Sequence, residues 1–193
     1  MKLYTFLIVF VFIIGCEAFE QNNKYTSKYD IHFRKYSKRY FGISFDWRWF
    51  KAQAIAESAL NDEAKSWTNA KGLMQLLPST FKELCERHPE IRCDIYHPRW
   101  NIAAGIRYDR DMWIKWRDIT PFENHLKFTF ASYNAGPGKI MEAQKCCLAK
   151  GLDKNRWSSV VKVAHEVGGW RYRETFAYIK RIEEVCSEIS PFH

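Results

Sequence analysis

The chain has 193 residues, which is enough for one domain with a hydrophobic core and too short for two domains of ordinary size. Hydrophobic residues make up 47% of it and aromatic residues 17%, a composition that excludes an intrinsically disordered protein. The formal net charge of +8 favours an anionic partner, such as nucleic acid, an anionic bilayer or a polymer that carries carboxylates.

Residues 1–18 are predicted to be an export signal. Lys2 precedes an apolar run of 13 residues that ends before Cys16, shorter than the roughly 20 residues of a membrane-spanning helix. The I-I-G-C sequence resembles a lipobox, in which Cys16 is acylated and anchors the protein to the outer membrane. The competing cleavage follows Ala18 and gives a soluble periplasmic protein. Because an exported protein rarely meets nucleic acid, no nucleic-acid partner is expected.

Residues 19–26 are polar and are predicted to be a tether. After them, apolar residues recur at intervals of three and four, the spacing of amphipathic helices. Capping and breaking residues divide this pattern into expected helices at 27–41, 47–58, 78–87, 98–116, 121–133, 138–149, 157–166 and 173–187. No stretch alternates with a period of two over the length of a strand. The sequence therefore predicts a single, mainly α-helical domain over residues 27–193.

The cysteines agree with an oxidising compartment. Cys85 and Cys93 bracket a short loop and could form a disulfide. The cysteines that follow are Cys146, Cys147 and Cys186, of which Cys186 could pair with either of the others. The rival interpretation is a zinc site made of Cys85, His88, Cys93 and His97. The export signal favours the disulfide, and no metal is expected.

Glu57 lies close to the end of an expected helix, among apolar residues. At 3.6 residues per turn its neighbours one turn back are Gln53 and Ala54, and the basic residues of the helix lie on another side. A carboxyl group in such surroundings loses hydration in its charged form, so its pKa rises. A raised pKa suits a general acid for the cleavage of glycosidic bonds. The alternative is an ordinary glutamate that faces solvent.

Amide and apolar groups follow Glu57 in an order that fits a sugar-binding groove. Gln75 could exchange hydrogen bonds with an N-acetyl group, and Met74 could supply a soft apolar wall. Asn134 offers a second amide in an N-A-G-P-G turn. The alternative for each is structural, because turn chemistry alone explains Asn134 and core packing explains many apolar residues.

Together these residues resemble a known family. The motifs are E-S-x-x-N at 57–61, G-L-M-Q-x-x-P-x-T at 72–80, A-S-Y-N-A-G at 131–136 and Y-I-x-x-I at 178–182. In this order they resemble the soluble-lytic-transglycosylase (SLT) family of lysozyme-like enzymes, over most of the chain from Trp47 to Ile182. Within the family the resemblance is closest to the catalytic domain of membrane-bound lytic transglycosylase F.

The resemblance implies a lysozyme-like fold and an enzyme that needs no cofactor. Such enzymes cleave the β-1,4 bond between N-acetylmuramic acid and N-acetylglucosamine in peptidoglycan without water, and leave 1,6-anhydromuramoyl ends. Glu57 would be the sole acid and base, and the substrate's own N-acetyl oxygen would replace the second carboxylate. The groove would be lined by Ser66, Met74, Gln75, Tyr133 and Asn134, with Tyr178 next to Glu57. We expect a monomer.

Two other functions fit the same groove. A hydrolytic, lysozyme-like muramidase would need a positioned water and usually a second acid. A non-catalytic cell-wall-binding protein would keep the groove without using Glu57 for chemistry. The catalytic interpretation is itself compatible with general wall turnover, with wall opening for a secretion apparatus and with phage-encoded lysis.

Overall fold

Helices account for all the regular structure of residues 25–189, the part of the chain that the computed structural model describes. They are α2 (Asp30–Phe41), α3 (Arg48–Ser58), α4 (Pro78–Arg87), α5 (Pro98–Lys115), α6 (Phe122–Ala135), α7 (Pro137–Ala149), α8 (Trp157–Val163), the 3-10 turn η1 (Ala164–Glu166) and α9 (Tyr172–Glu188). In this part of the chain two isolated bridges, Lys65–Lys71 and Lys71–Leu76, are the nearest approach to a sheet. The all-α prediction is confirmed.

Proline and glycine set several helix boundaries. Pro78, Pro98 and Pro137 each begin a helix, where the missing N–H is not needed. Gly42 and Gly136 end helices with φ values of 95° and 81°, in a region that side chains with a Cβ avoid. The predicted helix at 157–166 differs from the structure, because its last turn tightens into η1 after Val163.

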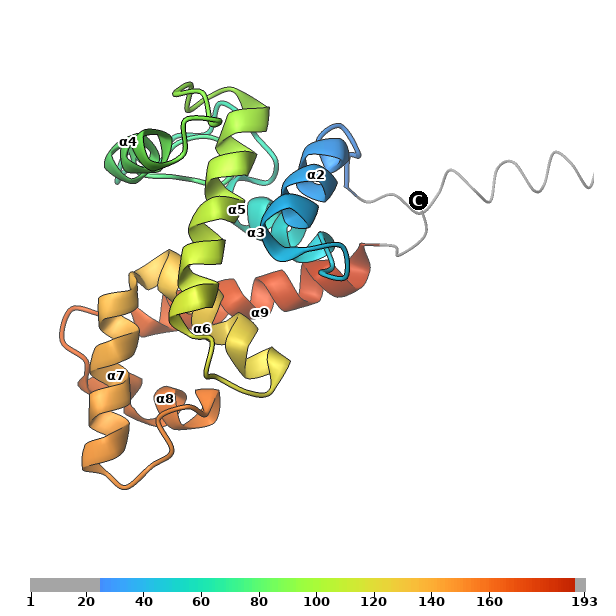
Figure 1. The fold of residues 1–193 in the computed structure, drawn as a ribbon. Coiled ribbons are helices and arrows are strands. Elements are labelled where there is room, and N and C mark those ends of the chain that lie inside the picture. Colours follow the sequence, from blue (N-terminus) through green and yellow to red (C-terminus); the bar gives the residue numbers. More distant parts are fainter. Residues whose placement is uncertain (1–24, 190–193) are drawn as a thin grey trace, which may run out of the picture.

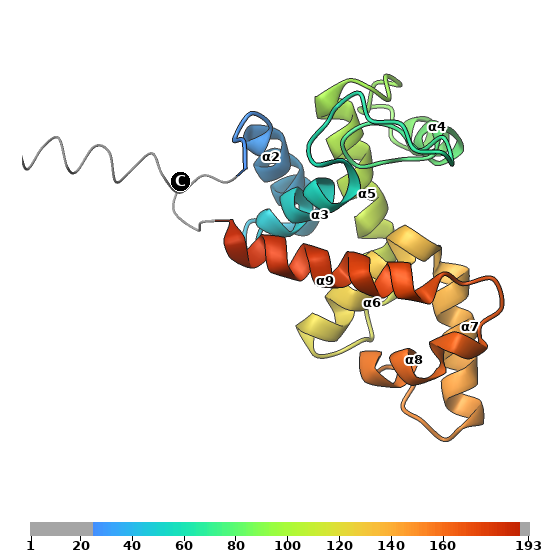
Figure 2. The same ribbon diagram turned by 180° about the vertical axis from the view of Figure 1, so that it is seen from behind.

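The helices form two lobes joined by long central helices. α5 packs against α2, α4 and α6, and α9 packs against α3 and α6. α4 and the loop that precedes it lie at one end of the molecule, and α7 and α8 lie at the other (Figures 1 and 2). At the end of α3, Glu57 interacts electrostatically with Asp109 of α5, Tyr133 of α6 and Tyr178 of α9. This meeting point is where the site described below is built.

Much of the aromatic content lies in the core. Phe41, Phe45, Phe50 and Trp113 form a cluster whose ring centroids are 4.5 to 5.8 Å apart. Beside it, the buried ammonium group of Lys51 lies 2.7 Å from a carboxylate oxygen of Asp30 and joins α3 to α2. A pair this well buried must be complete, because either charge alone would stay desolvated.

The predicted export signal at 1–18, Cys16 and nearly all of the predicted tether at 19–26 lie outside the described residues. Within residues 25–189, none of the helices is both long and apolar enough to cross a membrane.

Gly105 lets α5 approach the loop between α3 and α4. A Cβ at this position would lie 2.7 Å from the Cβ and Cγ of Met74, closer than carbon atoms pack. Met74 is itself fully buried, in an interior that is closely packed. The absence of a side chain at Gly105 therefore fixes how closely the loop sits on α5.

We predict that Gly105→Ala lowers the free energy of unfolding by about 1–3 kcal/mol, because the added methyl group overpacks the contact with Met74. Chemical denaturation monitored by circular dichroism measures this. Gly138→Ala is the matched control: Gly138 lies in helix α7 and a Cβ there meets nothing within 4 Å. That control should be neutral or stabilising by up to about 1 kcal/mol. Equal effects of the two substitutions would contradict the packing argument.

Candidate active site

Glu57 lies in the last turn of α3, and the chain leaves the helix directly after it. Ala59 and Leu60 follow with φ values of 52° and 62°, so the chain turns sharply away from the helix axis. The carboxyl group is only partly open to solvent. Its surroundings raise the pKa of Glu57 to about 7, chiefly because burial penalises the charged form. The sequence-based expectation of a pKa-shifted acid therefore has a structural cause at this position.

Tyr178 of α9 faces Glu57, as the resemblance implies. Its hydroxyl group lies close enough to Glu57 to favour the charged carboxylate, which lowers the pKa of Glu57 against the larger effect of burial. The hydroxyl group is buried and has no well-aligned partner in this structure. Hydrogen bonds in active sites are often poorly aligned before the substrate binds. Tyr178 thus limits how far burial raises the pKa of Glu57.

Asn101 holds the loop that runs from α3 to α4. This side chain is fully buried in α5. Its amide oxygen accepts a hydrogen bond of 2.7 Å from the backbone N–H of Met74, and its amide nitrogen donates to the carbonyl groups of Lys71 and Ile95. The sequence interpretation missed Asn101. The signal was a polar residue inside the apolar stripe of a predicted helix, where an unpaired amide would be costly.

Gln75 and Ser66 take part in building this loop. The amide nitrogen of Gln75 donates to the carbonyl groups of Ala64 and Gly72, at 3.2 and 2.9 Å. The hydroxyl oxygen of Ser66 accepts a hydrogen bond of 3.0 Å from the backbone N–H of Ala70. The predicted role of Gln75 as a hydrogen-bond donor to substrate therefore needs correction, because both donors serve the loop. Its amide oxygen is left as the group that could meet a ligand.

Met74 also differs from the prediction. Its side chain is fully buried and packs against Gly105, so it lies in the core beneath the loop and forms no accessible wall. The hydrogen bond from the Met74 backbone N–H to Asn101 holds this part of the loop against α5. What Met74 offers the site is its carbonyl group, which accepts a hydrogen bond of 2.7 Å from the hydroxyl group of Tyr133.

Tyr133 and Asn134 end helix α6 on the other side of the site. The ring of Tyr133 meets the ring of Tyr108 edge to face, with centroids 5.2 Å apart. Asn134 is exposed, and its amide oxygen accepts a hydrogen bond of 2.9 Å from the hydroxyl group of Thr175. A negative charge on Glu57 raises the pKa of the hydroxyl groups of both Tyr133 and Tyr178. These residues from three helices therefore form one cluster.

Two cavities lie near the end of α6. One, of about 330 Å³, is lined by Asn134 and by the exposed side chains of Trp67 and Arg171, with the Arg171 guanidinium 5.6 Å from the Trp67 ring centroid. The other, of about 580 Å³, is bounded by α4, α5 and the start of α7 and includes Tyr108.

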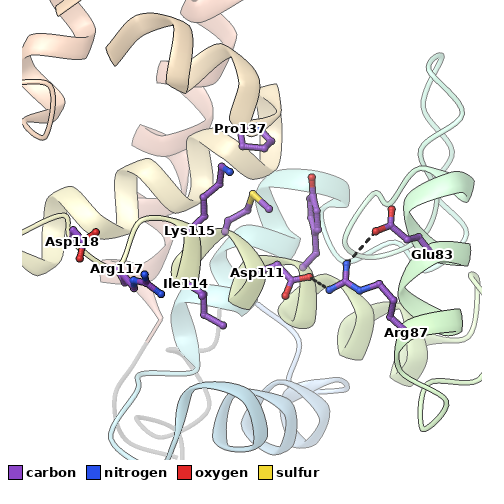
Figure 3. A pocket seen from close by; sticks show the side chains of 10 residues that line it. Glu83, Arg87, Asp111, Ile114, Lys115, Arg117, Asp118 and Pro137 are labelled. Atoms are coloured by element: carbon purple, nitrogen blue, oxygen red, sulfur yellow. Dashed lines mark hydrogen bonds and ion pairs between the residues drawn. The ribbon is translucent and has the colours of Figure 1, made fainter. Parts of the chain in front are cut away.

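The second cavity carries charges that neutralise one another. Figure 3 shows Arg87 between Glu83 and Asp111, at 3.1 and 2.8 Å, with Lys115 extending toward Pro137. Arg87 of α4 forms ion pairs with Glu83 of the same helix and with Asp111 of α5, so the second pair links the two helices. Glu57 does not line either cavity.

Cys85 and Cys93 are free thiols in this structure and lie close together. Burial, together with a hydrogen bond to Cys93, raises the pKa of the Cys85 thiol to about 12. The predicted disulfide stays a prediction. His88, a member of the alternative zinc set, accepts a hydrogen bond of 2.8 Å from Arg107. Within residues 25–189 no group of three or more His, Cys, Asp or Glu side chains is arranged to hold a metal ion.

A family model described as "Transglycosylase SLT domain" matches residues 33–155. The membrane-bound lytic murein transglycosylase F of Desulfosudis oleivorans is 35% identical over 119 residues, which are 62% of this chain and 25% of that protein. The protein of the same name from Shewanella pealeana is 35% identical over 136 residues, 70% of this chain and 26% of that protein. The chain thus spans about a quarter of the length of these curated relatives.

Solved structures show the same fold. The 70-kDa soluble lytic transglycosylase from Escherichia coli superposes with a TM-score of 0.65 at 22% identity, over 86% of this chain and 24% of that chain. An inactive mutant of the lytic transglycosylase Slt from Pseudomonas aeruginosa gives a TM-score of 0.67 at 20% identity, over 84% of this chain and 24% of that chain.

We predict that Tyr178→Phe raises the pKa of Glu57 above about 7, because it removes the hydroxyl group that favours the carboxylate. The measurement is a pH titration of the Glu57 side-chain carboxyl ¹³C shift by NMR. Tyr172→Phe is the control, on the same helix but outside the groups that shift this pKa. A Glu57 pKa that falls or stays unchanged in Tyr178→Phe would contradict the assignment.

Proposed function

We propose that this chain, which belongs to the transglycosylase SLT domain family, cleaves the β-1,4 bond between N-acetylmuramic acid and N-acetylglucosamine in peptidoglycan, leaving 1,6-anhydromuramoyl ends. Membership of the family confirms the resemblance seen in the sequence motifs. The observation that carries the proposal is a single partly exposed acid, Glu57, whose pKa of about 7 lets it start protonated near neutral pH.

Glu57 would act first as an acid and then as a base. Its proton goes to the glycosidic oxygen as the bond from C1 to the leaving N-acetylglucosamine breaks, while the N-acetyl oxygen of the muramoyl residue bonds to C1. The resulting Glu57 carboxylate then takes the proton of the muramoyl 6-hydroxyl group. The 6-oxygen attacks C1, the N-acetyl oxygen leaves, and the anhydro ring closes with Glu57 protonated again.

The carboxylates around Glu57 support this single-acid chemistry over hydrolysis. Asp109 interacts electrostatically with Glu57 but is completely buried, so it can neither attack a sugar nor activate a water. Asp62 accepts a hydrogen bond of 2.8 Å from Tyr29 and lies 3.6 Å from Lys28. Among the described residues no exposed acid shifts the pKa of Glu57, so the N-acetyl group of the substrate is the nucleophile that fits best.

The surroundings of Glu57 support a polymeric substrate. The two cavities near the end of α6 give successive sugars of a glycan chain room to bind. Trp67 presents an exposed ring at one of them, and sugar rings stack on aromatic faces. We propose that Asn134, Tyr133 and the amide oxygen of Gln75 contact the glycan, and that Ser66 acts by shaping the loop.

We propose further that residues 1–18 direct export to the periplasm and that Cys16 is acylated, with residues 19–26 as the tether to a domain that acts as a monomer. The relatives from Desulfosudis oleivorans and Shewanella pealeana are named as membrane-bound, which supports anchoring. A disulfide between Cys85 and Cys93 fits the same compartment, and their proximity supports it.

We predict that Glu57→Gln lowers the release of muropeptides from purified sacculi by at least about 100-fold, the usual contribution of a general acid and base. Muropeptides released by the wild type should carry anhydro ends, each one water lighter than a reducing end, when identified by mass spectrometry. Glu63→Gln, an exposed neighbour in the following loop, is the control and should keep its activity.

Reducing ends from the wild type would identify a muramidase instead. Full activity of Glu57→Gln would leave the wall-binding alternative. For the wild type, kcat/KM should fall as pH rises through about 7, because the protonated form of Glu57 is lost there.

We predict that labelled fatty acid is incorporated into the wild type and not into Cys16→Ser, since Cys16 carries the thiol of the lipobox. Metabolic labelling followed by immunoprecipitation measures this. Incorporation in both proteins would reject Cys16 as the acylated residue, and incorporation in neither would favour cleavage after Ala18.

A further inference from the structure

A second acid lies buried behind Glu57, and the proposed chemistry does not use it. Asp109 is in the middle of α5 and is completely buried. The groups that shift its pKa, apart from burial itself, are Gln53 and Glu57, and neither is a cation. A desolvated carboxylate without a cation is one of the least favourable groups a protein can contain. Asp109 therefore needs a stabilising interaction other than an ion pair in order to be buried here.

Gln53 provides its hydrogen-bond partner. The amide nitrogen of Gln53, in α3, donates to Oδ1 of Asp109 at 3.2 Å. The remaining oxygens of the pair, Oε1 of Gln53 and Oδ2 of Asp109, are both buried and have no hydrogen-bond partner. Both oxygens are acceptors when Asp109 is charged, so no hydrogen bond can form between them. One proton on Oδ2 would turn that oxygen into a donor.

We propose that Asp109 is a neutral carboxylic acid that forms two hydrogen bonds with the side-chain amide of Gln53. We propose that this acid–amide pair positions the last turn of α3, which carries Glu57. In the pair, the Oδ2 hydroxyl group donates to Oε1 of Gln53 while the Gln53 amide donates to Oδ1. A single proton satisfies both orphaned oxygens, which is why the neutral form suits this site.

The groups that face Asp109 agree with a neutral acid. Glu57 of α3, Tyr133 of α6 and Tyr178 of α9 all interact electrostatically with it, as does Tyr108 beside it on α5. Each of these groups is neutral or negative, so none stabilises a negative charge on Asp109. Burial raises the pKa of Asp109 well above its ordinary value, in the same direction.

The pair matters to Glu57 in two ways. Gln53 lies one turn before Glu57 on α3, so its bond to α5 holds the helix end that carries the acid. A neutral Asp109 also exerts no charge repulsion, whereas an ionised one would raise the pKa of Glu57 further. This second consequence rests on the proposed function; the pair itself does not.

Asp109→Asn tests the pair, because an amide can make the same two hydrogen bonds without a proton. Keeping Asp109 protonated weakens folding at neutral pH: a folded-state pKa above the unfolded one gives stability that is present at low pH and lost as pH rises. The unfolding constant of the wild type, relative to Asp109→Asn, should therefore rise about tenfold per pH unit above about pH 4, up to the pKa of folded Asp109.

Asp109→Leu is the matched control, since it removes both hydrogen bonds and leaves Gln53 unpaired. It should unfold more readily than Asp109→Asn at every pH. Denaturant titrations from pH 4 to pH 8 measure all three proteins. A ratio of wild type to Asp109→Asn that does not change with pH would overturn the proposal. Failure of Asp109→Asn to fold would overturn it as well, because the amide fits the pair.

A direct measurement uses the wild type alone. The side-chain carboxyl ¹³C shift of Asp109 should remain that of a protonated acid from pH 4 to pH 7, and a shift that titrates near the ordinary pKa of Asp would refute the pair. In the activity profile, the midpoint of the fall in kcat/KM should be the same in Asp109→Asn and in the wild type. A lower midpoint in the variant would mean that Asp109 is ionised. Absence of activity in both would reject the proposed function while leaving the stability and NMR results valid.

Discussion

The desolvation of one carboxyl group is the constraint on which this site depends. The pKa of Glu57 is raised to about 7 because its carboxyl group is buried at the end of α3, next to Asp109, Tyr133 and Tyr178. Everything that fixes that helix end therefore also sets the chemistry. Tyr178 works against the burial by favouring the carboxylate, so the acid can release its proton as well as hold it.

The loop between α3 and α4 has no regular structure of its own and is held by side chains instead. Asn101 reaches into it from α5, and Gln75 and Ser66 bond to its backbone from within. A loop pinned by buried hydrogen bonds is rigid enough to present groups to a ligand in a fixed geometry. Gly105 completes the arrangement by letting the loop lie close against α5.

Several buried polar side chains of α3 and α5 each have a partner on another part of the chain. Lys51 has Asp30, Asn101 has three backbone groups, and Asp109 has Gln53. Leaving such a group unpaired costs more free energy than repacking an apolar residue. Buried polar pairs therefore favour one arrangement of the helices over others. The helix ends near Glu57 are thereby fixed more closely than packing alone would require.

The sequence by itself determined the helices, their proline and glycine boundaries, and the family, because these follow from periodicity and from motifs of neighbouring residues. It also singled out Glu57 as a candidate acid, and the family resemblance implied that Tyr178 lies near it. Only the tertiary structure decided that Met74 is buried and that the side-chain amide of Gln75 donates its hydrogen bonds to the backbone of the loop. Burial and hydrogen-bond partners depend on contacts between residues far apart in the chain, such as Asn101 with Met74, and no local pattern records them.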